Sequence, residues 1–213
     1  MCAECKDYPC SFTEVAARKP EAIKKGARIQ LVIFVLGISG SPRKDGNTDI
    51  VVREALAQLH SKKSVNAKFG RITDFHIKHC AGCRECMHLG YCIIQDDDFG
   101  KLWDEILRAD VIIEGAPVYW NSPPGVMKDF VDRTHGFFIK PGILNGKKAA
   151  IISVATESGF ACCETVLQSW LGYYGAEIVD QVRIYAREKG EVLQKPAEMA
   201  KIGALVATIC ERL

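Results

Sequence analysis

Apolar segments that alternate with helix-like segments constrain the fold of this chain most strongly. The segment "LVIFVLGIS" (31–39) is almost continuously apolar and rich in branched side chains, which is typical of a strand buried on both faces of a sheet. Further strand candidates follow at 66–75, 111–117, 148–155 and 176–184. The spacing of apolar residues between them predicts helices at 48–59, 98–109, 124–135, 161–173 and 195–211. Strands separated by helices in this way predict an α/β fold with a five-stranded, doubly wound parallel sheet.

The bulk properties narrow the class of protein further. With 213 residues, the chain can bury a large core and needs no disulfides to fold. Its net charge of +2 is too balanced for a nucleic-acid or membrane-surface binder, and its longest apolar run, 31–38, is too short to span a membrane. Residues 1–28 are charged throughout and lack the apolar core of a signal peptide. We therefore expect a cytoplasmic protein with reduced thiols and with no nucleic-acid or membrane partner.

The first strand runs into "GISGSPRKDGNT" (37–48), a turn rich in glycine and hydroxyl groups at the start of a helix. Ligands of doubly wound sheets lie beyond the carboxyl ends of the strands, and a helix N-terminus favours negative charge. The turn contains neither a Walker loop nor a dinucleotide motif. It either binds a phosphate or only caps the helix, with Asn47 or Thr48 as N-cap. The candidate phosphate contacts are Ser39, Ser41, Pro42, Arg43, Asn47 and Thr48.

The segment "APVYWNS" (116–122) follows the third strand candidate and offers two flat aromatic side chains. Such faces suit a flavin ring, whose polar edge would accept hydrogen bonds from backbone N–H groups near Tyr119 to Asn121. Pro117 has no N–H and fixes the turn instead. The alternative is a pair of ordinary half-buried aromatic residues at a strand end. The candidate ring contacts are Pro117, Val118, Tyr119, Trp120 and Asn121.

Taken together, "GISGSPRKDGNT" and "GAPVYWNSPPGVMKDFVDR" (115–133) resemble the flavodoxin-like NADPH-dependent FMN reductase family, from about residue 31 to the C-terminus. The resemblance implies a three-layer αβα fold with strand order 2-1-3-4-5 and FMN as cofactor. It places the phosphate on the first loop and the ring on the loop after strand three. It also implies a third flavin loop in "ATESGFACC" (155–163), with Thr156, Ser158 and Gly159 as contacts. Small residues there let the backbone approach a flat ligand.

Four cysteines lie within "HCAGCRECMHLGYC" (79–92), in a long segment between the second strand and the next helix (76–97). The spacing C-x2-C-x2-C-x5-C is similar to the turn with which bacterial ferredoxins hold a [4Fe–4S] cube. Zinc is an alternative, although its structural sites usually take two separated C-x2-C pairs, and inert thiols are another. His79 and His88 flank the motif and are expected to be bystanders. The candidate cluster ligands are Cys80, Cys83, Cys86 and Cys92.

The other cysteines are expected to play no part in the cluster. Cys162 and Cys163 are interpreted as small, partly buried residues at a helix start, and Cys210 as core packing. Residues 1–28 form a separate cysteine-containing extension before the flavodoxin-like domain at 29–213, and Cys2, Cys5 and Cys10 belong either to a mobile tail or to a second metal site. In the helix after the ring loop, Asp132 and Arg133 are expected to form a structural pair.

A compact cysteine motif inside such a chain resembles the iron–sulfur flavoproteins. That resemblance implies a homodimer or homotetramer that relays electrons between ferredoxin or NAD(P)H and a small-molecule acceptor. FMN itself would be the reactive centre, because the sequence offers no obvious catalytic acid or base. A cluster-free NAD(P)H-dependent FMN or quinone reductase and a zinc module on the same scaffold are the alternatives.

Overall fold

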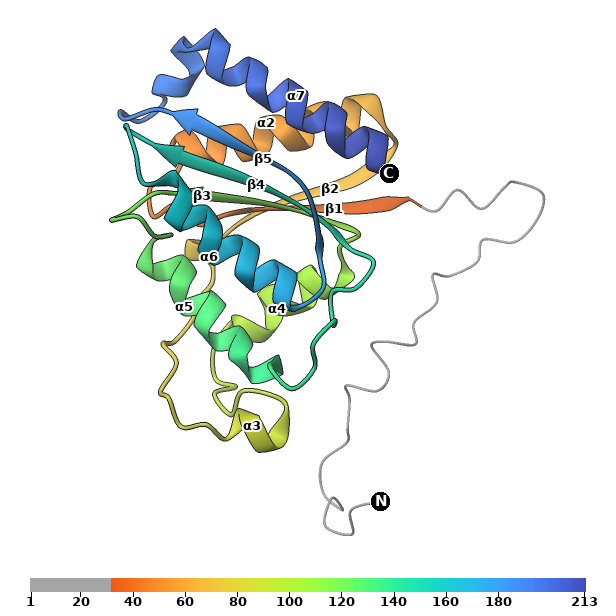
Figure 1. Cartoon of the computed structure of the whole chain (residues 1–213), viewed down its shortest axis with the longest axis vertical. Coiled ribbons are helices and arrows are strands. Elements are labelled where there is room, and N and C mark those ends of the chain that lie inside the picture. The colour runs from red at the N-terminus through yellow and green to blue at the C-terminus, as the bar shows by residue number, and fades with distance from the viewer. Residues whose placement is uncertain (1–31) are drawn as a thin grey trace, which may run out of the picture. The chain divides into compact units, whose positions relative to one another are not determined.

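The computed structural model describes residues 32–213, so the predicted extension at 1–28 lies outside the described residues. The described chain forms one parallel sheet in the order β2-β1-β3-β4-β5 (Figure 1), which confirms the predicted topology. The strands are β1 Ile33–Ser39, β2 Val65–Arg71, β3 Val111–Pro117, β4 Lys148–Ala155 and β5 Glu177–Tyr185. The second strand is shorter than predicted because a 3-10 turn, η1 Ile72–Asp74, follows it directly.

Helices cover both faces of the sheet, which gives the three αβα layers seen in Figure 1. The strands are buried on both faces because successive side chains point to opposite sides: Ile112 packs in one apolar cluster, whereas Val111 and Ile113 pack in the other. The first cluster lies under α4 Phe99–Arg108, α5 Gly125–Arg133 and α6 Phe160–Tyr173, and the second under α2 Asn47–Lys62 and α7 Pro196–Arg212.

The shorter elements connect these layers. They are α3 Cys86–Leu89, which interrupts the predicted cysteine loop, and the 3-10 turns η2 Thr134–Phe137 and η3 Glu191–Gln194. Among residues 32–213, we find no helix with the length and apolar character that a bilayer crossing requires. Because every strand runs in the same direction, the loops after β1, β3, β4 and β5 all leave from one edge of the sheet. That edge is where a ligand is expected.

Candidate functional site

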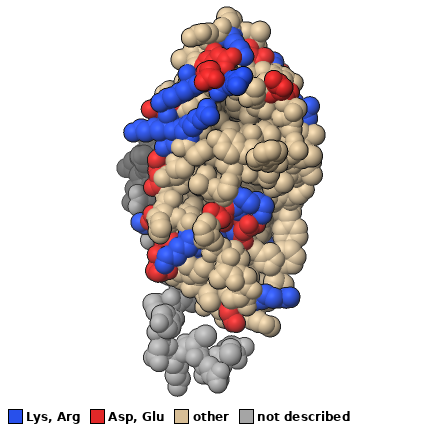
Figure 2. Space-filling model, turned by 90° about the vertical axis from the view of Figure 1, so that its left-hand side faces the viewer, with Lys and Arg blue, Asp and Glu red and all other residues tan. Residues whose placement is uncertain are grey.

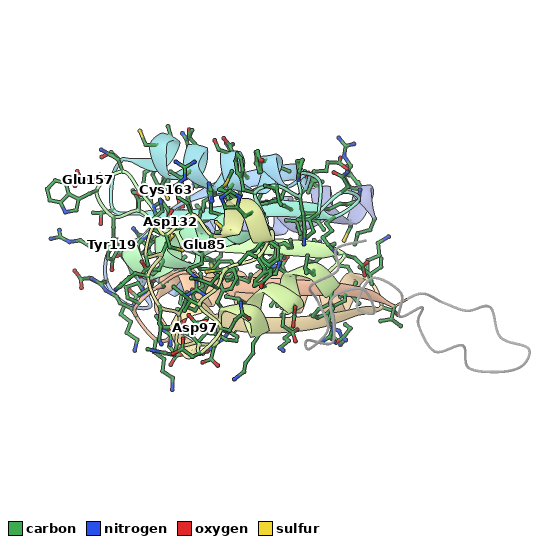
Figure 3. The ribbon with its side chains drawn as sticks, turned by 90° about the horizontal axis from the view of Figure 1, so that it is seen from below. Glu85, Asp97, Tyr119, Asp132, Glu157 and Cys163 are labelled. Carbon is green, nitrogen blue, oxygen red and sulfur yellow. The ribbon has the colours of Figure 1, made fainter. Side chains whose placement is uncertain are left out.

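Two adjoining hollows open at this edge of the sheet, where loops from four strands meet. Tyr119, after β3, and Glu157, after β4, lie at the same end of the molecule (Figure 3) and line these hollows. The predicted flavin contacts that line them are Ser41, Arg43, Asn47, Thr48, Pro117, Val118, Tyr119, Trp120, Asn121, Thr156 and Ser158. Of the predicted flavin contacts, Ser39, Pro42 and Gly159 are not in the lining.

Buried hydrogen bonds hold the loop after β1 in shape. The Ser39 hydroxyl donates to the Asp49 carboxylate at 2.5 Å and accepts the N–H of Ser41 at 3.3 Å. The other oxygen of Asp49 accepts the N–H of Asp45 at 2.8 Å and lies 2.9 Å from Nε of Arg71. Ser39 therefore braces the loop from below, while the Ser41 and Thr48 side chains line the hollow.

Asn47 connects this loop to a segment that the sequence analysis missed. Its Nδ2 donates to the Glu188 carbonyl at 2.8 Å, and its Oδ1 accepts the Val192 N–H at 3.2 Å. The loop after β5 is thereby held against the first loop, and Ala186, Arg187 and Lys189 join the lining. The signal for these residues was available, because "AREKG" follows the last strand candidate at the same sheet edge.

The electrostatics of this edge favour an anion. Arg43, Arg187 and Lys189 line the first hollow, and among residues 32–213 no acidic side chain lines it with them, whereas Glu157 lines the adjoining hollow. Figure 2, which faces this edge, shows basic side chains gathered in the upper part of the surface with a few acidic ones among them. Three cations around a turn of backbone and hydroxyl donors suit a phosphate group.

The loop after β3 forms a tight two-residue turn. Tyr119 and Ser122 exchange two backbone hydrogen bonds, at 2.8 and 2.9 Å, and Trp120 and Asn121 between them have positive φ angles of 49° and 61°. Trp120 is 99% exposed. From the sequence, we expect backbone N–H groups of this stretch to donate hydrogen bonds to a flavin ring. The N–H of Tyr119 instead donates to the Ser122 carbonyl within the turn, so it is not free for a ring.

The loop after β4 closes the site from the other side. Thr156 and Ser158 line the hollows, and Gly159 has a φ of +86°. A Cβ on Gly159 would lie 2.6 Å from Oδ1 of Asn121 and 2.8 Å from the Val118 side chain, so only glycine lets the two loops approach this closely. The loops after β3 and β4 thereby form adjoining walls of the second hollow.

The four candidate cluster cysteines lie on the loop that carries α3, beyond α4 and α5 (Figure 1). Cys80 and Cys83 are exposed, Cys86 and Cys92 are partly buried, and all are free thiols. The pKa of Cys86 is raised mainly by burial of its thiol. The neighbouring thiols of Cys92, Cys83 and Cys80 raise this pKa further. Within residues 32–213 no three potential ligands converge closely enough to hold a metal ion.

Residues of α5 and η2 contact this loop. The Nε of Arg133 donates to Sγ of Cys92 at 3.1 Å, and Nδ1 of His135 lies 3.6 Å from Sγ of Cys86. The predicted pairing of Asp132 with Arg133 is wrong: Arg133 pairs with Asp97 at 2.5 Å, whereas Asp132 pairs with Lys128 one helical turn away. Consecutive helix residues point in different directions, so the two could not face each other.

The remaining cysteines differ in their surroundings. Cys162 is exposed at the start of α6, and Cys163 beside it is fully buried. Burial, followed by the nearby carboxyl groups of Glu114 and Glu164, raises the pKa of Cys163 to about 12, so this thiol is not a nucleophile at neutral pH. Cys210 packs against the apolar cluster under α7.

The fold and the site together define a flavodoxin-like flavoprotein, and the family model for "NADPH-dependent FMN reductase" matches residues 33–190. The chain belongs to this family of flavin-dependent oxidoreductases, which supports FMN as its flavin. Curated relatives include an iron–sulfur flavoprotein of Methanocaldococcus jannaschii, 36% identical over 59% of this chain and 64% of the relative, or less than two thirds of its length. Another, from Methanosarcina thermophila, is 28% identical over 79% of this chain and 86% of the relative.

Solved structures confirm the fold. An NADH:FMN oxidoreductase in its apo form superposes with a TM-score of 0.63 at 18% identity, covering 84% of this chain and 88% of the other. A flavone reductase superposes with a TM-score of 0.65 at 19% identity, over 82% of this chain and 60% of the other. At such low identity, these likenesses establish the architecture alone.

Proposed function

We propose that this protein is an FMN-dependent oxidoreductase and electron-transfer flavoprotein that carries a [4Fe–4S] cluster on Cys80, Cys83, Cys86 and Cys92. The observation that carries the proposal is a single loop with four free thiols, joined to a flavodoxin-like scaffold whose sheet edge has a hollow lined by three basic side chains. The donor set fits the cluster, because each iron of such a cube takes one protein thiolate. The thiols must converge on loading, which is common for metal sites that form together with their metal. The names of the two methanogen relatives support the same assignment.

The chain would hold FMN through the loops described above. Ser41, Thr48 and the cations Arg43 and Arg187 would bind the phosphate, and the loops after β3 and β4 would border the ring. When bound, FMN supplies two-electron chemistry and the cluster supplies one-electron transfer. The protein side chains orient and shield these groups, and none of them is assigned as a catalytic acid or base. Ferredoxin or NAD(P)H would be the donor, and a small molecule the acceptor.

The cluster assignment predicts a specific pattern of losses. Alanine in place of Cys80, Cys83, Cys86 or Cys92 should each abolish most bound iron and acid-labile sulfide while FMN content stays at the wild-type level, because the phosphate loop lies elsewhere. Cys162→Ala and Cys210→Ala are matched controls and should keep the cluster. Anaerobic purification followed by iron, sulfide and flavin analysis measures all three. Wild-type protein that holds zinc or no sulfide would contradict the assignment.

A cluster-free NAD(P)H-dependent FMN or quinone reductase is the second candidate. The observation that favours it is the lack of convergence of the thiols in the described chain. The same analysis separates the two, because a plain reductase would contain flavin without iron and sulfide and would be unaffected by the cysteine substitutions.

We further propose that the protein is a homodimer or homotetramer. Large apolar side chains are exposed on and beside the cysteine loop, and a second copy of the chain would cover them; they are Leu89, Tyr91, Ile93, Phe138, Ile139 and Tyr173. Sedimentation velocity should give two or four times the mass of one chain, and Ile139→Ser with Tyr173→Ser should weaken the assembly. A wild-type monomer at micromolar concentration would rule this assembly out.

A further inference from the structure

One buried guanidinium lies at the centre of the cysteine loop. The Arg133 side chain is 0% exposed although it comes from the last residue of α5, outside the loop. Its Nη1 donates to the Lys78 carbonyl at 2.9 Å, and its Nη2 donates to the Ile94 carbonyl at 2.8 Å. Its Nε donates to Sγ of Cys92 at 3.1 Å. Arg133 therefore forms hydrogen bonds with the loop at three places: at Lys78 before the first cysteine, at Cys92, which is the last cysteine, and at Ile94 after it.

The carboxylate that balances this charge also ties the loop ends together. Asp97, whose side chain is 1% exposed, lies 2.5 Å from Nη1 and 3.4 Å from Nη2 of Arg133. Its oxygens also accept the N–H of Lys78 at 3.0 Å and the N–H of Phe99 at 3.1 Å. All five N–H donors of Arg133 are thus used within one loop. A lysine at position 133 could not make this forked set of contacts.

We infer that Arg133 is a positioning residue for the cluster: it presents Cys92 as the fourth ligand and raises the reduction potential of the cluster. The inference rests on the proposed cluster and goes beyond it to the control of its potential. A reduced cluster carries one more negative charge than the oxidised cluster. A buried positive charge and an N–H bonded to a ligand sulfur both stabilise that reduced form.

Two substitutions should move the potential in opposite directions. Arg133→Gln removes a positive charge beside Cys92 and should make reduction of the cluster at least tenfold less favourable, a shift of about 59 mV to lower potential for a one-electron couple. Asp97→Asn removes the balancing negative charge and should shift the potential upward. Arg183→Gln is the matched control, because its partner Glu164 lies on α6 rather than on the cysteine loop, and it should leave the potential unchanged.

The experiment uses anaerobically loaded full-length protein, with iron and sulfide analysis followed by a dithionite titration monitored by electron paramagnetic resonance. A purely structural role for Arg133 would not give shifts of opposite sign. Loss of iron from Arg133→Gln with full FMN content also supports the positioning role. If Arg133→Gln does not fold, Arg133→Lys replaces it and should lose iron occupancy. Asp97→Asn still tests the predicted upward shift of the reduction potential.

The outcomes also separate this inference from the proposed function. Wild-type protein without iron and sulfide would overturn both. Wild-type protein that loads normally, together with Arg133 and Asp97 variants that keep full iron and an unshifted potential, would overturn the role of Arg133 alone.

Discussion

At the scale of single residues, Trp120 occupies a backbone conformation that a bulky side chain rarely adopts. Its φ of 49° places it at the first central position of a two-residue turn that normally selects asparagine, aspartate or glycine. Such a conformation costs on the order of 1–3 kcal/mol and persists only where the surrounding structure imposes it. Here the paired hydrogen bonds of Tyr119 and Ser122 impose it. The result is a fully exposed indole at the rim of the proposed ring site.

Ser41 allows a direct test of the phosphate loop. We expect Ser41→Leu to weaken FMN binding by about 1.5–3 kcal/mol, or roughly 10- to 150-fold in Kd, because a hydrogen bond to a charged group is lost and a bulky side chain enters the hollow. Quenching of FMN fluorescence on binding to apoprotein measures the Kd. Ser61→Leu, on the exposed end of α2, is the control and should bind FMN normally. Equal affinities for the two variants would contradict the loop assignment.

At the scale of elements, α5 and the following turn η2 form the base on which the cysteine loop rests. Three residues within positions 133 to 136 contact the cysteine loop: Arg133, His135 and Gly136. A Cβ on Gly136 would lie 2.7 Å from the backbone nitrogen of Cys92. The backbone of the fourth candidate ligand can therefore reach its place only because residue 136 has no side chain.

A pair of glycine substitutions tests this contact. Gly136→Ala should push Cys92 away and reduce bound iron and sulfide at least severalfold while FMN binding is unchanged. Gly172→Ala is the matched control, since this glycine lies in α6 and, apart from its chain neighbours and the nearby helix backbone, no atom of the described residues lies within 4 Å of the added Cβ. It should keep the cluster and stabilise the helix by about 0.5–1 kcal/mol. Iron analysis and chemical unfolding of both variants check these outcomes. A full iron content in Gly136→Ala would show that Cys92 does not need a glycine at position 136 to bind the cluster.

At the scale of the whole molecule, the centre of the sheet contains one acidic side chain. Glu114 of β3 lies between Ile38 of β1 and Ile151 of β4, and neither of its carboxyl oxygens has a hydrogen-bond partner among the described residues. Burial raises the pKa of Glu114 from 4.5 to about 8. The folded protein therefore holds this carboxyl group protonated at neutral pH, whereas the unfolded chain releases the proton.

This difference makes the free energy of unfolding depend on pH. The pKa of Glu114 is higher in the folded state than in the unfolded state. Its contribution to the free energy of unfolding is therefore fully present below pH 4.5 and is lost as pH rises to about 8. One proton corresponds to a slope of at most about 1.4 kcal/mol per pH unit in that window. Urea unfolding at pH 5, 6.5 and 8.5 should show the wild type losing stability relative to Glu114→Gln, which stays neutral throughout. Parallel pH profiles of the two proteins would mean that Glu114 is ionised in the fold.

The sequence by itself determined the alternation of strands and helices in this protein, whereas the strand order was implied by the family resemblance and is confirmed by the structure. Continuous branched apolar runs can be satisfied only by strands covered on both faces, and the periodicity between them places the helices within a few residues. Local motifs also identified three of the four loops that line the hollow, those after β1, β3 and β4, because carboxyl ends of parallel strands necessarily share an edge.

Only the tertiary structure decided which side chains face a ligand and which brace the loop. Ser39 has the same hydroxyl group as Ser41, and the amide of Asn47 could equally well bind a ligand, but their partners, Asp49 and the loop after β5, are set by packing. The contact of Arg133 with Cys92 joins residues 41 positions apart in the chain. No spacing rule reaches across that distance, because the pairing depends on how α5 lies against the cysteine loop.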